Sequence, residues 1–187
     1  MPQAIVASIP EPHATQVADL WQALEDRFGV HSHLTEEFPH FSLHMARSYG
    51  PELEERLRAF AVTHPPLRVR TAGLGMFTRD KQVLYLPLVR NPRLNDFHRE
   101  LWRAVSGLGE DVAAYYRPER WIPHLTLALD RLDQYNLGGV IHWLSDQKLD
   151  WVFDVSELAL LTSNGEQRAE PFRVPLVGSA EGSTRKS

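Results

Sequence analysis

Cysteine is absent from the 187-residue chain. Disulfide bonds, thiolate metal sites and a cysteine nucleophile are therefore excluded. The length suffices for one domain, or for two small lobes that share a core. An apolar share of 43% and a charged share of 24% are ordinary values for a globular protein.

The sequence also lacks long apolar runs and a surplus of positive charge. No stretch approaches the ~18 apolar residues of a membrane-spanning helix, and the first residues, MPQAIVASIPEPH, have no basic start typical of a signal peptide. The formal net charge of −4 disfavours DNA binding, which needs a broad basic surface. We therefore expect a cytoplasmic protein without membrane or DNA partners. Nothing demands more than a monomer, and a few local cations would suffice for a short nucleotide.

Hydrophobic periodicity divides the chain into alternating strands and helices. Strands are expected at 3–10, 39–46, 67–77, 82–89, 121–129, 150–165 and 167–177, and helices at 12–29, 50–64, 91–109 and 133–147. Residues 67–77 and 82–89 should form one hairpin, and 150–165 and 167–177 another around Asn164-Gly165. This order predicts an α+β fold with mostly antiparallel strands. We expect residues 1–177 to form one domain and 178–187 to be a disordered tail.

One short phrase occurs twice. PHFSL at 39–43 returns as PHLTL at 123–127, one in each half of the chain, and the halves loosely repeat each other. Alternate residues of a strand share a face, so each copy places an imidazole and a hydroxyl side by side while its apolar residues point into a core. A single strand histidine is usually structural, but two such copies indicate function.

The doubled phrase suits in-line attack on a phosphodiester. If the two strands lie near each other across a pseudo-twofold axis, His40, Ser42, His124 and Thr126 converge on one cleft. Two imidazoles can supply the base at the entering oxygen and the acid at the leaving oxygen. The hydroxyls can donate hydrogen bonds to the non-bridging oxygens. This arrangement requires no metal.

These motifs resemble the 2H phosphoesterase superfamily, in its 2′-5′ RNA ligase-like branch. The resemblance is carried by His40-Phe41-Ser42-Leu43, by His124-Leu125-Thr126-Leu127, and by residues 73–89, which look like the central hairpin of the family. It extends from about Ala4 to about Leu176.

The resemblance implies a bilobal, pseudo-symmetric α+β fold, with two mostly antiparallel sheets and flanking helices around a central cleft. It also implies hydrolysis of 2′,3′-cyclic phosphates or related 2′-5′ phosphodiesters in nucleotides or RNA ends, without metal or cofactor, and in some members the reverse joining of RNA ends. By that analogy His40 protonates the leaving 3′ oxygen and His124 activates water. The near-symmetry of the motifs leaves the opposite assignment open.

The sequence departs from the family pattern at two places. Ser42 stands where threonine is more usual, which keeps the donor and removes only a methyl group. The basic residue that often follows the second motif in RNA-processing members is replaced by Ala128, Leu129 and Asp130, with Arg131 one step later. RNA ends, small nucleotides and other cyclic phosphates therefore all stay open as substrates, as does a 2′- or 3′-phosphate product.

Further candidates for substrate binding surround the motifs. Phe77 and Tyr85, on the central hairpin, could stack a base or pack in the core. Preceding the second motif are four residues that could contact phosphate and base, or form a plain connecting loop: Tyr116, Arg117, Arg120 and Trp121.

His44 lies four residues after His40, on the same face if the strand stays regular. It could extend the cleft or hydrogen-bond an edge. His31 and His33 have no carboxylate or cysteine at a familiar spacing, so we expect no metal site. Two alternatives to an enzyme are a binding module that holds a nucleotide or RNA end without turnover, and a structural protein whose repeat is a relic of duplication.

Overall fold

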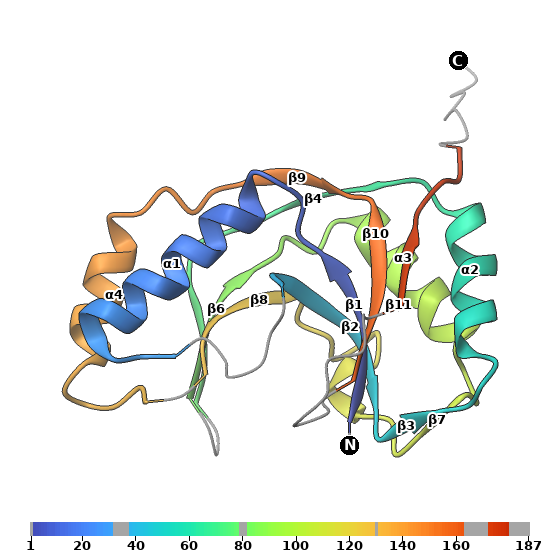
Figure 1. Ribbon diagram of the computed structural model, residues 1–187, viewed down its shortest axis with the longest axis horizontal. Coiled ribbons are helices and arrows are strands. Elements are labelled where there is room, and N and C mark those ends of the chain that lie inside the picture. The colour runs from blue at the N-terminus through green and yellow to red at the C-terminus, as the bar shows by residue number, and fades with distance from the viewer. Residues whose placement is uncertain (1, 32–37, 79–81, 130, 163–171, 180–187) are drawn as a thin grey trace.

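The computed structural model describes residues 2–31, 38–78, 82–129, 131–162 and 172–179, and its fold is α+β, as expected (Figure 1). Within these residues seven strands form one antiparallel sheet. Its order from edge to edge is β11 (Phe172–Pro175), β10 (Glu157–Thr162), β1 (Gln3–Ser8), β2 (His40–Ala46), β8 (His124–Ala128), β6 (Gln82–Pro87) and β5 (Gly75–Thr78). Two short ribbons pair β3 (Ser48–Tyr49) with β7 (Gly109–Glu110), and β4 (Leu67–Arg70) with β9 (Val152–Val155).

The helices are shared between the two ends of the sheet (Figure 1). Helix α1 (His13–Phe28) packs against β8 and against α4 (Leu137–Ser145), whereas α2 (Leu53–Thr63) packs against β11 and against α3 (Pro92–Ala104). A short 3-10 helix, η1 (Ala114–Tyr116), precedes β8. Although α1 follows β1 in the chain, it packs against β8 in the other half of the sheet. In the described part of the chain, no helix is both long and apolar enough to cross a membrane.

The two halves of the sheet meet at the two Pro-His strands. β2 and β8 pair through one pair of opposed residues, Phe41 with Leu125. The expected pair of sheets is thus joined at one point into a continuous, open sheet, with β11-β10-β1-β2 on one side and β8-β6-β5 on the other. Two lobes flank the strands that carry the repeated motif.

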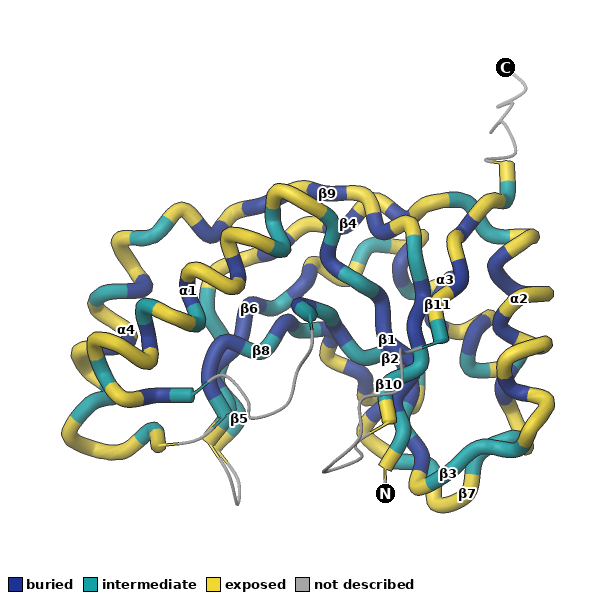
Figure 2. Tube along the Cα trace, in the orientation of Figure 1, coloured by how far each residue is buried: buried dark blue, intermediate teal, exposed yellow. Residues whose placement is uncertain are grey.

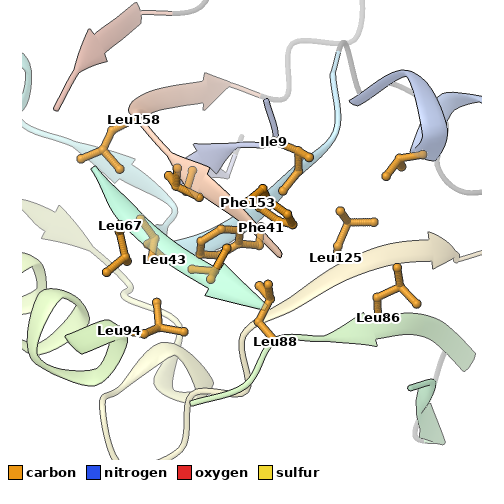
Figure 3. Packing of buried hydrophobic residues seen from close by; sticks show 14 of the residues in the cluster. Ile9, Phe41, Leu43, Leu67, Leu86, Leu88, Leu94, Leu125, Phe153 and Leu158 are labelled. Carbon is orange, nitrogen blue, oxygen red and sulfur yellow. The ribbon is translucent and has the colours of Figure 1, made fainter. Parts of the chain in front are cut away.

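The core fills the space between the sheet and the layers that cover it. Phe41 and Leu125 are 1% and 0% exposed, and Figure 3 shows them beside other buried side chains such as Leu43 and Leu88. The helices alternate between buried and exposed residues, as expected for amphipathic helices with one face on a core (Figure 2). The apolar residues of both motifs are therefore core residues, as the alternation predicted.

Local signals fix the helix ends. The Asn91 side chain accepts a hydrogen bond from the Leu94 amide at 2.9 Å, and Pro92 occupies the first turn of α3. Gly29 ends α1 with a φ of 64°, a left-handed conformation that glycine adopts without steric cost. Both boundaries agree with the sequence pattern.

Four predicted elements have wrong bounds. The strand expected at 150–165 is not continuous. Within 150–162, β9 pairs with β4, and β10 begins after Ser156 and joins the main sheet beside β1. Residues 67–77 split likewise into β4 and β5, so the first hairpin consists of β5 and β6 alone. Helices α3 and α4 are shorter than expected. The predicted turn at 164–165 and nearly all of the predicted tail lie outside the described residues.

Candidate active site

The two motifs bring their polar side chains to one face of the sheet. With Phe41 opposite Leu125, the antiparallel register sets His40 across from Thr126 and Ser42 across from His124. The four side chains are half-buried and point away from the core, whereas the residues between them are buried. Each imidazole thus has one hydroxyl on its own strand and the other hydroxyl across from it.

Both imidazoles are held in the same way. His40 Nδ1 lies 3.0 Å from the Phe38 carbonyl oxygen, and His124 Nδ1 lies 2.7 Å from the Ile122 carbonyl oxygen. A carbonyl can only accept a hydrogen bond, so Nδ1 carries the hydrogen in both rings. Nε2 of each ring is therefore the atom that can exchange a proton with a ligand. The two motifs thus match in the tautomer of their histidines as well as in sequence.

Two tryptophans support the hydroxyl residues from behind. Trp121 Nε1 donates to the Ser42 carbonyl oxygen at 3.0 Å, and Trp21 Nε1, from α1, donates to the Thr126 carbonyl oxygen at 3.0 Å. Both bonds satisfy the carbonyl of a residue next to the Phe41–Leu125 pair. The sequence singled out Trp121, but as a substrate contact. It gave no sign of Trp21, because α1 lies far from the second motif in the chain.

Aromatic rings surround His124. Tyr85 pairs with Thr126 across β6 and β8, and its ring centroid lies 5.0 Å from that of His124. The Phe77 ring lies 5.0 Å from His124, edge-on, and 4.3 Å from Tyr85. Phe77 and Tyr85 therefore line the site beside His124.

Burial lowers the pKa of His124 from its ordinary value of 6.5, and its hydrogen bond to the Ile122 carbonyl opposes this only in part. Burial also raises the pKa of the Tyr85 hydroxyl. Both shifts favour the neutral form of the group.

His40 has different neighbours. Ser8 of β1 is directly opposite His40 in the strand pair, and the Phe38 ring meets the imidazole edge-on with centroids 5.7 Å apart. The site is therefore symmetric in its motifs and asymmetric in its surroundings.

His44 does not share the face of His40, which corrects the expectation from the spacing. Val6 pairs with Ser42 but Ile5 pairs with His44, so β2 carries one extra residue between them, and this bulge turns His44 inward. His44 is 3% exposed, and its Nδ1 lies 2.5 Å from the Tyr49 hydroxyl. Burial, followed by the charge of His98, lowers its pKa to about 4.

The residues before β8 are divided between core and surface. Trp121 is 1% exposed and stacks on His98 with ring centroids 3.7 Å apart, and Tyr116 is also buried. Neither can stack on a substrate, which corrects that candidate role. Arg117 and Arg120 are exposed on the turn between η1 and β8.

Two other groups singled out in the sequence lie near the end of β8. Arg131 is exposed just beyond this strand, with a φ of 61°. His31 pairs with Glu25 at 3.4 Å, and His33 lies outside the described residues. Across the described ranges, no group of three or more histidine, aspartate or glutamate side chains is placed to hold a metal ion.

Comparison with known proteins identifies the family. The sequence profile of the 2′-5′ RNA ligase superfamily matches residues 9–167. The chain belongs to this superfamily. None of the curated proteins matches it.

Solved structures show the same fold. The structure of E. coli LigT complexed with 3′-AMP is 18% identical, with a TM-score of 0.60, over 93% of this chain and 96% of LigT. TT0787 of Thermus thermophilus is 16% identical, with a TM-score of 0.58, over 96% of this chain and 100% of its own. A structure described as a phosphoesterase is 18% identical, with a TM-score of 0.60, over 93% and 97% of the two chains. The fold is that of the 2H phosphoesterases, and family and fold together indicate a phosphoesterase or RNA ligase-like enzyme.

Proposed function

We propose that this enzyme opens 2′,3′-cyclic phosphates, or cleaves related 2′-5′ phosphodiesters, in nucleotides or RNA ends. The observation that carries this proposal is the pair of imidazoles on one sheet face, each fixed through Nδ1 and each beside two hydroxyls. Solved structures of LigT contain 3′-AMP, ATP or phosphate, which supports a nucleotide substrate by analogy.

His124 acts as the base in this proposal. Its lowered pKa leaves Nε2 unprotonated near pH 7, ready to take a proton from water as the water oxygen attacks phosphorus. His40 acts as the acid and delivers a proton from Nε2 to the 3′ oxygen as the bond from phosphorus to that oxygen breaks. The product is a 2′-phosphate with a free 3′ hydroxyl. The same steps in reverse, with an RNA hydroxyl, would give ligation.

Ser42 and Thr126 bind the phosphate. Each hydroxyl lies across from the opposite imidazole in the register, so both can donate to the non-bridging oxygens, where charge accumulates. The two-imidazole chemistry needs no metal, and we propose that the protein works without a cofactor, as a cytoplasmic monomer.

The test is turnover of adenosine 2′,3′-cyclic phosphate in the presence of EDTA. We expect His40→Ala and His124→Ala each to lower kcat by about 10²–10⁴-fold, because each removes a general acid or base. Ser42→Ala and Thr126→Ala should each cost about tenfold or more. His142→Ala, exposed on α4, is the control. Full activity in either motif-histidine variant would contradict the mechanism, and nucleotide binding without turnover in the wild-type protein would instead favour a binding module.

A further inference from the structure

Arg173, on the edge strand β11, lies on the motif face, which is the sheet face that carries His40, Ser42, His124 and Thr126. Arg173 on β11 pairs with Ala159, Ala159 pairs with Val6, and Val6 pairs with Ser42. Directly opposed residues of neighbouring strands point to the same face, so Arg173 shares a face with Ser42. Nothing in the sequence singles out Arg173, because it lies far from both motifs in the chain.

The side chain of Arg173 extends toward His40. Its guanidinium lies over the Phe38 ring, 4.0 Å from the centroid, and Phe38 in turn meets the His40 ring edge-on. Nη1 donates to Ser8 Oγ at 3.3 Å and to Glu157 Oε1 at 2.5 Å, and Ser8 Oγ also donates to Glu157 at 3.0 Å. Because Ser8 is directly opposite His40, the guanidinium lies one side chain beyond His40, on the side away from His124.

The guanidinium is held in place and keeps hydrogen-bond donors for a ligand. Both hydrogen bonds that Arg173 makes within the described residues use Nη1, which leaves the donors of Nε and Nη2 for a ligand. The Arg173 and Glu157 side chains are 38% and 33% exposed, so water and ligands reach the pair. A guanidinium preorganised over an aromatic ring suits two-point binding of a phosphate.

The position excludes the scissile phosphate as the partner of Arg173. That phosphate must lie between His40 and His124, whereas β1 and Ser8 separate Arg173 from this midline. A second phosphate, attached to the substrate on the His40 side, would lie where Arg173 is.

We propose that Arg173 binds the phosphate on the 5′ side of the ribose whose cyclic phosphate is opened. The preferred substrate is then a 5′-phosphorylated nucleotide or the 3′ end of a nucleotide chain, and not a bare nucleoside cyclic phosphate. This inference rests on the proposed function. The shared chemistry is a 5′ phosphate, either a terminal monoester or an internal diester.

Three substrates test the inference: adenosine 2′,3′-cyclic phosphate, the same compound with a 5′-phosphate, and a diadenosine dinucleotide ending in a 2′,3′-cyclic phosphate. Arg173→Gln should raise KM about tenfold for whichever compound carries the recognised phosphate, because a charge-assisted hydrogen bond is lost. KM for adenosine 2′,3′-cyclic phosphate, which has no 5′-phosphate, should change less than about twofold, because Arg173 does not contact it. If Arg173→Gln raises KM for the second compound alone, the ligand of Arg173 is a terminal phosphate. If it raises KM for the third compound, the ligand is an internal phosphate.

Arg58→Gln is a matched control. Arg58 also lies over a phenylalanine, Phe172, and pairs with a glutamate, Glu54, but it is on α2, outside the motif face. Glu157→Gln removes the carboxylate that repels an incoming phosphate, so it should lower KM for the same compounds that Arg173→Gln weakens.

Binding measurements separate this inference from the proposed function. By calorimetry, Arg173→Gln should weaken the binding of adenosine 3′,5′-bisphosphate about tenfold, but should leave the binding of 3′-AMP nearly unchanged. Equal effects on both ligands, or no effect on either, would overturn the inference while leaving the proposed function intact. If the wild-type protein turns over none of the three substrates, the proposed function fails, and the binding data alone decide the role of Arg173.

Discussion

At the scale of single residues, two histidines with the same motif have different surroundings. Phe77 and Tyr85 enclose His124, whereas Ser8 and Phe38 adjoin His40. Burial is the main reason that the pKa of His124 is lowered. The proposed role of His124 as base therefore rests on neighbours that the motif does not contain.

Phe77→Ala should move the acid limb of the pH–rate profile to higher pH. Removing the ring lets water approach His124, so its pKa should rise back toward about 6.5 and the base should be protonated at higher pH. The profile of kcat/KM against pH, together with an NMR titration of His124, measures the shift. Phe28→Ala is the control, because it removes a ring contact between α1 and Trp143 on α4. An unshifted His124 titration in Phe77→Ala would show that other groups lower this pKa.

Two buried histidines should make the protein acid-sensitive. Burial lowers the pKa of both His44 and His98 to about 4, and His98 Nδ1 has no hydrogen-bond partner within the described structure. The unfolded chain takes up these protons near pH ~6.5 and the folded chain only near pH 4. The free energy of unfolding should therefore fall as pH decreases through this window, by about 3 kcal/mol per histidine at most.

Urea unfolding between pH 7.5 and 4.5 tests this dependence. His98→Gln lowers stability at every pH, because the stacking on Trp121 is lost, but it should make the fall with pH shallower. Leu94→Ala, also on α3, destabilises without removing a titrating group, so it should keep the wild-type slope. If the free energy of unfolding falls equally steeply with pH in both variants, His98 does not cause the acid sensitivity.

At the scale of elements, strand irregularities position the site. The bulge in β2 keeps His40 and Ser42 on the motif face and turns His44 into the core. The register of β6 and β8 also shifts, between Leu84 and Tyr85, next to the aromatic side of the site. Sequence alternation predicts which residues share a face only as far as the first bulge, because a bulge depends on cross-strand pairing.

Gly75→Ala should disturb the aromatic wall beside His124. A β-carbon at Gly75 would lie 2.4 Å from the Tyr85 ring, so the ring must move. We expect a loss of about 1–3 kcal/mol in stability together with lower kcat/KM. Gly138→Ala on α4 meets nothing within 4 Å and should stabilise the helix by about 0.5–1 kcal/mol. Thermal unfolding and turnover of both variants check this, and unchanged kcat/KM in Gly75→Ala would show that the Tyr85 position is not needed.

At the scale of the whole molecule, the chain crosses between its lobes. β1 lies in one half of the sheet and α1, which follows it, packs against β8 in the other. Phe41 and Leu125 join the halves through one core cluster. We therefore expect the two halves to unfold together.

Leu24→Ala, on the buried face of α1, should destabilise both halves by about 2–5 kcal/mol. Fluorotryptophan signals from Trp143 on α4 and Trp102 on α3 report on the two halves separately. Their midpoints in urea should coincide in the wild type and shift equally in the variant. Leu57→Ala, on α2 in the other half, should have the same effect on both signals. Two separate transitions would show that the halves fold independently.

The sequence by itself determined the α+β class, the amphipathic helices and the motif pair, because these follow from periodicity and local chemistry. It indicated that His40 shares a face with Ser42, and His124 with Thr126. Only the tertiary structure decided that Trp121 and His44 are buried, that residues 152–162 divide between two sheets, and that Arg173 lies beyond Ser8 on the His40 side of the site. These features depend on the pairing of strands far apart in the chain, and strand pairing leaves no periodic signal in the sequence.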